Sequence, residues 1–127
     1  MTTRNLAHSC AVGKVLLSYL SGVELNHLIK ERGLSKRTEN TLSDPAQLKE
    51  HLILVRKQGY AIDDEENEKG IRCLGAPIFD GKGRPVAAIS VSGSVFQVTK
   101  KAVHDVMKGE VLAASAEISR RLGFQGG

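Results

Sequence analysis

The stretch GIRCLGAPIFDGKGRPVAAISVSG, residues 70–93, decides the fold of this chain. Two apolar runs, 71–79 and 84–93, lie on either side of the turn sequence DGKG at 80–83. Asp and Gly favour a tight turn, whereas the Ile and Val residues of the two runs favour extended strands. The stretch therefore predicts a β-hairpin.

The register of this hairpin decides which polar side chains meet. A loop with an even number of residues would place Cys73 opposite Ser90 and Ile71 opposite Ser92, all on one face. A three-residue loop would break these pairs. The second strand is otherwise suited to burial, so its hydroxyls and the thiol need partners. A ligand is one candidate; alternatively, the serines bond neighbouring backbone and Cys73 is a small core residue.

A first helix is expected over residues 8–20, capped by His8 or Ser9. Its apolar residues recur at three- and four-residue steps: Val12, Val15, Leu16, Tyr19 and Leu20. The early-turn N–H groups of Ala11 and Val12 lack helical partners, and the helix dipole favours an anion there. A carboxylate between this helix start and the two serines would be held by neutral donors alone.

Two further helices have clear boundaries. A capping box between Ser21 and Glu24 begins a second helix, which stops near Gly33. The run Asp44-Pro45-Ala46-Gln47 begins a third, which ends at Gly59. The residues expected to point inward in this third helix are Leu48, Leu52 and Val55.

A short strand at 60–62 follows, and a last helix is expected from Thr99, its cap, to Gly123, with Gly109 weakening or bending it. Its predicted inward residues are Val103, Val106, Met107, Val111, Ala114, Ile118 and Leu122. Together these elements predict one α+β domain, residues 1–127, with antiparallel strand pairing.

Composition excludes several classes of protein. The 127 residues, 41% hydrophobic and 25% charged, suit one soluble domain that needs no disulfides. Cys10 and Cys73 lie far apart and form no CxxC unit, so no zinc site is expected. The net charge of +4 comes from scattered basic pairs, which predicts solvated helix faces rather than a nucleic-acid surface. No signal peptide or membrane span is expected, which favours a cytoplasmic location.

Catalysis is not expected. Cys73 would need a base or a positive field to act as a nucleophile, and none of the four histidines has a motif that links it to this thiol; each is expected on a helix surface. The acidic block at 63–66, followed by Glu68, lacks the ligand spacing of a calcium loop and is expected to be a solvated turn. Neither a metal nor a cofactor is expected.

Six blocks follow one another along the chain: HSCAVGK (8–14), TL (41–42), RKQGYAIDDEE (56–66), GIRC (70–73), APIFD (76–80) and AAISVSG (87–93). In this order and spacing, the blocks together resemble the effector-binding domain of IclR-type transcriptional regulators. The resemblance covers residues 4–123. It implies a GAF-like antiparallel sheet flanked by helices, which binds a small metabolite, frequently a carboxylate, and thereby alters DNA binding by a separate winged-helix domain.

Carried over to this sequence, the resemblance places effector contacts at Ala11, Val12, Asp63, Ile71, Cys73, Ser90 and Ser92. It also implies homodimers or tetramers. The chain contains no winged helix, and it begins after the segment that supplies the first elements of the family domain, so a partial domain is expected. Two alternatives stay open: a stand-alone GAF-like thiol enzyme that uses Cys73, and an oligomerisation module without a ligand.

Overall fold

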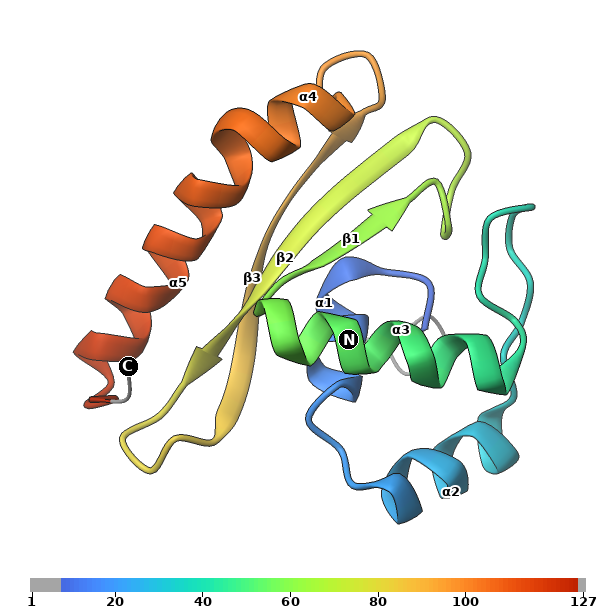
Figure 1. Ribbon diagram of the computed structural model, residues 1–127, viewed down its shortest axis with the longest axis horizontal. Helices are drawn as coiled ribbons and strands as arrows, with labels where there is room; N and C mark the ends of the chain where they lie inside the picture. The colour runs from blue at the N-terminus through green and yellow to red at the C-terminus, as the bar shows by residue number, and fades with distance from the viewer. Residues whose placement is uncertain (1–7, 126–127) are drawn as a thin grey trace.

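The computed structural model describes residues 8–125 and consists of a three-stranded antiparallel sheet flanked by helices (Figure 1). The elements are α1 (Ala11–Leu17), α2 (Gly22–Arg32), α3 (Pro45–Gln58), β1 (Ala61–Asp64), β2 (Ile71–Phe79), β3 (Pro85–Ser94), α4 (Lys100–Ala102), the π-helix η2 (Val103–Met107) and α5 (Lys108–Arg121). The strand order β1-β2-β3 and the antiparallel pairing confirm the predicted α+β class.

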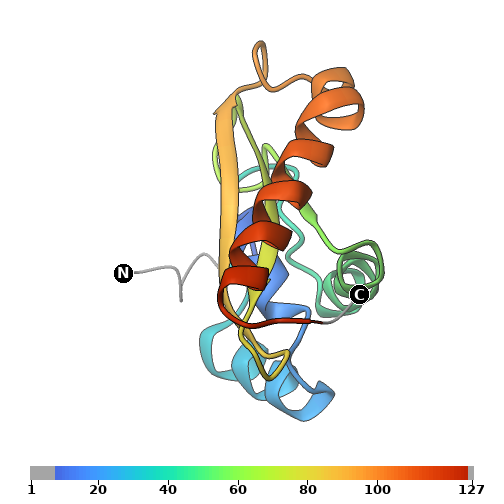
Figure 2. The same cartoon turned by 90° about the vertical axis from the view of Figure 1, so that its left-hand side faces the viewer.

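The sheet separates two groups of helices. Helix α5 lies along one face, and α1 and α3 lie on the other side with α2 beyond them (Figure 1). We call these the α5 face and the α1 face. Figure 2 shows β3 at one edge, and no described strand pairs with its outer side.

The boundaries of α2 and α3 follow from local chemistry, as predicted. The Glu24 N–H donates to Ser21 Oγ at 3.1 Å, and the Ser21 N–H donates to the Glu24 carboxylate at 3.0 Å. The Gln47 N–H donates to the Asp44 carboxylate at 3.0 Å. Gly59 ends α3 with a φ of 85°, a conformation that glycine adopts without steric cost.

The predicted hairpin is correct, but its predicted register is wrong by two residues. Cys73 pairs with Ser92, and Gly75 pairs with Ser90. Phe79 pairs with Pro85 instead of the expected Arg84, which shifts the register by one residue. The irregularity between Ile78 and Phe79 shifts it by one residue more. Because side chains alternate with a period of two, this even shift leaves the predicted residues on the predicted face.

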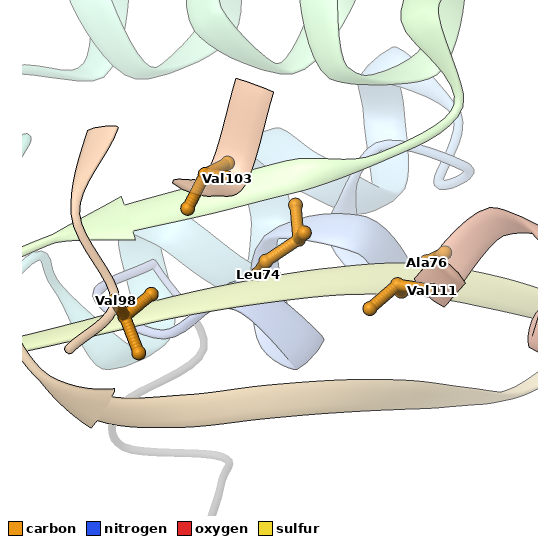
Figure 3. Close-up of a cluster of buried hydrophobic side chains, with 5 residues drawn as sticks. All are labelled: Leu74, Ala76, Val98, Val103 and Val111. Atoms are coloured by element: carbon orange, nitrogen blue, oxygen red, sulfur yellow. The ribbon is translucent and has the colours of Figure 1, made fainter. Parts of the chain in front are cut away.

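The α5 face carries the main core of the sheet. Its buried residues are Leu74, Ala76, Val98, Val103 and Val111 (Figure 3). On the α1 face, Gly75 lets helix α1 approach closely, since a Cβ on this glycine would lie 3.3 Å from backbone and side-chain atoms of Ala11. A second core joins the three N-terminal helices through Leu17, Leu25, Leu48 and Leu52.

The first helix differs from its prediction. It begins only at Ala11, after Cys10, and neither His8 nor Ser9 caps it. His8 is buried, and its ring lies 2.7 Å from the Ser35 carbonyl oxygen. Leu16, a predicted inward residue, is 36% exposed, whereas Lys14 is completely buried. A charged residue is therefore buried at position 14, which the apolar pattern did not predict to face inward.

The last helix is not a regular α-helix. Thr99 caps it as predicted, accepting from the Ala102 N–H at 3.0 Å, but η2 interrupts it before Gly109 is reached. Val106 and Leu122, which were predicted to point inward, are 56% and 50% exposed, and Ser115 and Ser119 are buried instead. Val103 and Val111 are buried as predicted, so the apolar spacing marks the inner face in part, and the wider π turn changes the spacing between inward residues.

Candidate functional site

A row of polar side chains crosses the α1 face, with one residue from each strand. Asp63 of β1 pairs with Cys73 of β2, which pairs with Ser92 of β3. Ser90 lies in the next row, opposite Gly75. We call Asp63, Cys73, Ser90 and Ser92 the polar row. The structure thus brings together four of the seven predicted contact residues.

The start of α1 adds two of the remaining three residues. Ala11 is buried against Gly75, and the Val12 backbone nitrogen lies 3.4 Å from the position of a Cβ there. The last one, Ile71, pairs with Ser94 and is half-buried. With seven residues, α1 is shorter than predicted, so its dipole contributes less than a long helix would.

The polar row runs from a buried end to an open end. Asp63 is 1% exposed and Cys73 is half-buried, whereas Ser90 and Ser92 are exposed. The expectation of buried serines is therefore wrong. Helix α1 contacts β3, where Ala88 packs against the cluster that contains Val15, but Ser90 and Ser92 lie on a part of the strand that stays exposed. Both hydroxyls are accessible to a ligand from solvent.

The Cys73 thiol is held in its neutral form. Burial, and next the nearby Asp63 carboxylate, raise the pKa of Cys73 to about 11. Hydrogen bonding with Asp63 acts in the same direction, while hydrogen bonding with Ser92 opposes it. A thiol with this pKa forms very little thiolate near neutrality, which counts against a catalytic role as nucleophile.

Asp63 is held from behind by the acidic turn that follows it. Its carboxylate accepts from the Glu66 N–H at 2.8 Å. Burial is the largest cause of a raised Asp63 pKa, and the Glu66 backbone bond opposes it. Asp63 therefore gains a proton more readily than an exposed aspartate does.

A buried ion pair behind the polar row was not predicted from the sequence. Lys14 Nζ lies 2.8 and 3.0 Å from the two Glu66 carboxylate oxygens, and it also donates to the Ile62 carbonyl. The His51 Nε2 lies 3.0 Å from the same ammonium. We call Lys14, His51 and Glu66 the ammonium cluster; it ties α1, α3 and the acidic turn together.

The acidic block is consequently not the solvated turn that was expected. Asp63 and Glu66 are buried, and Asp64 binds Arg72 at 2.8 Å. Thr38 and Thr41 donate to the carbonyl groups of Glu65 and Glu66. One feature of the sequence could have indicated that Lys14 is buried: it lies three residues after Ala11, so both residues fall on the same face of the helix.

The ammonium cluster gives stability a pH dependence. Burial, and next the Lys14 charge, lower the pKa of His51 to about 4, against about 6.5 in an unfolded chain. Because the unfolded state then binds the extra proton, His51 stabilises the fold above pH 6.5, and this contribution is lost as pH falls toward 4. Since the ring is partly solvated, we expect the loss to be about 1–2 kcal/mol.

Urea unfolding of the His51→Gln variant checks this expectation. The Gln side-chain oxygen can still accept from Lys14 but does not titrate. The difference in unfolding free energy between pH 7 and pH 4.5 should therefore be smaller in the variant than in the parent chain. An unchanged difference would show that His51 is not the titrating group.

Two further searches of residues 8–125 gave negative results. No group of three or more His, Cys, Asp or Glu side chains there is arranged to hold a metal ion. Within the same residues, no helix is both long and apolar enough to cross a membrane.

Solved structures of bacterial transcription regulators share the fold of this chain. The inducer-binding domain of the Acinetobacter transcription factor PobR, solved as a double mutant with 3-hydroxybenzoic acid, superposes with a TM-score of 0.86 at 27% identity, covering 89% of this chain and 65% of that one. For the Thermotoga maritima IclR structure the TM-score is 0.81 at 43% identity, covering 93% and 47%. The chain therefore has the fold found in these two transcription regulators.

Sequence comparison identifies the family. Residues 3–120 match the model of the bacterial transcriptional regulator IclR C-terminal domain. The chain is 40% identical to the transcriptional repressor IclR of Escherichia coli and 39% identical to the regulator BhcR of Paracoccus denitrificans. These matches cover 91% and 92% of this chain but 42% of each relative. The chain belongs to the IclR family of transcriptional regulators and corresponds to their C-terminal domain.

Proposed function

We propose that this chain binds a small organic acid on the α1 face and that binding modulates DNA recognition by a separate winged-helix domain. The contacts in this proposal are Ala11, Val12, Asp63, Ile71, Cys73, Ser90 and Ser92. The observation that carries it is the polar row, which offers two accessible hydroxyls beside a buried carboxyl and a neutral thiol. The PobR domain, described as an inducer-binding domain with a hydroxybenzoic acid, supports an acid as the ligand class.

Each member of the polar row has a distinct role in this proposal. The Ser90 and Ser92 hydroxyls donate to the ligand carboxylate, aided by the Val12 backbone N–H. Asp63 accepts from a ligand hydroxyl or fixes the edge of the site. Cys73 lines the site as an uncharged thiol, whereas a thiolate would repel the anionic ligand. Because the raised pKa of Cys73 counts against a nucleophile in this site, we propose a sensor rather than an enzyme.

A thermal-shift screen followed by calorimetry tests the proposal. The screen uses 3-hydroxybenzoate, pyruvate and gluconate as aromatic, keto and sugar acids. A ligand that binds the native state alone stabilises it by RT ln(1 + [L]/Kd), so a true sensor shows a higher melting temperature with at least one acid. A chain that only oligomerises would show none.

The Ser90→Ala/Ser92→Ala variant then locates the site. Both hydroxyls are exposed, so their removal opens no cavity and the fold should keep its stability. We expect calorimetric affinity to fall by about 100-fold or more, because each lost hydrogen bond to a charged group costs about 1.5–3 kcal/mol and each 1.4 kcal/mol is a factor of ten. Ser43→Ala, at another exposed serine, serves as the control. Unchanged affinity in the double variant would refute this site.

We also propose that the chain assembles as a dimer or tetramer. Strand β3 supports this part of the proposal, because it lies at the sheet edge with Val86 and Val91 53% and 38% exposed. Exposed strand edges pair readily with other chains.

A further inference from the structure

A second candidate ligand site lies on the α5 face, away from the polar row. A cavity of about 260 Å³ opens between β1, the start of β2 and the α4–η2–α5 helix. Ile62 and Asp64 line it, and they alternate along β1 with Ala61 and Asp63, which belong to the α1 face. The two candidate sites are therefore on opposite faces of the sheet.

The floor of this cavity is apolar and partly aromatic. Tyr60, Ile62 and Val103 line it, and Tyr60 and Ile62 pack against the core of the α5 face. Apolar and aromatic side chains of this kind commonly line the part of a pocket that binds the apolar portion of a small molecule.

The rim of the cavity has an excess of positive charge. Asp64 is its one lining carboxylate, and Arg72 already engages it through two nitrogens, at 2.8 and 2.9 Å. Lys100 lies 3.8 Å from Asp64 and is 79% exposed at its side chain, while the Lys108 ammonium lies 5.6 Å from the centre of the Tyr60 ring. Three basic side chains thus face one carboxylate; Lys100 reaches Asp64 only at 3.8 Å, and within the described residues Lys108 forms no ion pair.

The π-helix supplies an independent observation. Val103 and His104, the first two residues of η2, line the cavity, and Lys108 follows η2 directly. Insertions of this kind cost helix hydrogen-bond geometry and occur frequently at functional sites. Here the wider turn sets the helix surface that faces the cavity.

We propose that this cavity binds a small organic anion. The acid group lies between the ammonium groups of Lys100 and Lys108, and the apolar body of the ligand packs on Tyr60, Ile62 and Val103. This assignment is independent of the site on the α1 face, since the two sets of residues share no member.

Amide chemical-shift mapping with three matched probes tests the proposal. Benzoate carries both the charge and the ring, benzyl alcohol the ring alone, and inorganic phosphate the charge alone. We expect benzoate to shift the amide signals of Tyr60, Ile62, Val103 and His104. Benzyl alcohol and phosphate should each bind at least about fivefold more weakly than benzoate. Equal binding of benzyl alcohol or phosphate would overturn the combined charge-and-ring assignment.

Matched variants separate the cavity from general charge effects. Lys100→Gln/Lys108→Gln should weaken benzoate binding at these amides by about fivefold or more, whereas Lys108→Arg should keep it. Lys82→Gln/Lys101→Gln removes the same charge from exposed positions outside the cavity and should have no effect. Benzoate shifts that are confined to the polar row, or that weaken equally in both double variants, would refute the second site without affecting the first.

Discussion

Replacing Lys14 by Met should lower the free energy of unfolding by about 3–5 kcal/mol, the cost of leaving one partner of a buried ion pair alone. Lys14 is completely buried, and its removal leaves Glu66, His51 and the Ile62 carbonyl without the ammonium that they share. Met keeps most of the volume, so the loss reports charge and hydrogen bonding rather than a cavity. A small domain has about 5–15 kcal/mol of stability in total, so urea unfolding should reveal the effect clearly.

The control for this variant is Lys101→Met. Lys101 also pairs with a carboxylate, Asp105, at 2.9 Å, but its side chain is 87% exposed. Surface pairs contribute little, so we expect a change of about 0.5 kcal/mol or less. Similar losses at the two positions would contradict the assigned role of Lys14.

A double variant tests whether Lys14 and Glu66 act as one unit. Lys14→Met/Glu66→Met removes both charges, so its cost should be clearly smaller than the sum of the two single losses. Additive losses would mean that the two groups stabilise the fold separately. The Glu66 carboxylate also accepts from the Asp64 N–H at 3.0 Å, so some cost remains even when both charges are absent.

Gly75→Val is the second variant with a large expected effect, a loss of about 1–3 kcal/mol in unfolding free energy from overpacking. A Cβ at this position would lie 3.3 Å from the Ala11 backbone and side chain, and two γ-carbons would intrude further. Val is otherwise favoured in strands, so strand propensity alone predicts the opposite sign. Helix α1 must move away from the sheet, which also displaces Ala11 and Val12 relative to the serines.

Gly22→Val is the matched control, because a Cβ there meets no atom within 4 Å and the position lies at the start of α2. We expect no loss of stability at Gly22 in thermal or urea unfolding, since Val has a helix propensity no worse than that of Gly. Equal loss in both variants would contradict close packing of α1 against Gly75.

The elements of this fold could be predicted where local chemistry determines them. The caps at Ser21, Asp44 and Thr99 and the stop at Gly59 depend on residues within one helical turn, and each is confirmed. The hairpin register depends on turn geometry and on the irregularity after Ile78, which the residue pattern does not reveal. Periodicity succeeded only in part in the last helix: Val111 is buried as predicted, whereas Val106 within η2 and Leu122 at the helix end are exposed.

Part of the candidate site could also be predicted, because the alternation of side chains along a strand is a local property. The period of two placed Cys73, Ser90 and Ser92 on one face although the register was wrong. Burial of Lys14 and Glu66 was not predictable, because each charge is acceptable inside only when the other lies beside it. These residues are 52 positions apart, and their contact exists only in the folded chain.

The ammonium cluster also matters for the proposed function. Lys14 lies on the helix that carries Ala11 and Val12, and Glu66 holds Asp63 through its N–H. The cluster therefore fixes the spacing between the helix start and the buried end of the polar row. A ligand that contacts both would act on two elements that the ammonium cluster already joins.

The central claim is that a small organic acid binds on the α1 face, and amide chemical-shift mapping tests it most directly. An acid selected by the thermal-shift screen is titrated into the parent chain and into Ser90→Ala/Ser92→Ala. We predict saturable shifts at Val12, Asp63, Cys73 and Ser92 in the parent chain, and their loss in the variant. Shifts that avoid the α1 face, or that persist unchanged in the variant, would contradict the claim.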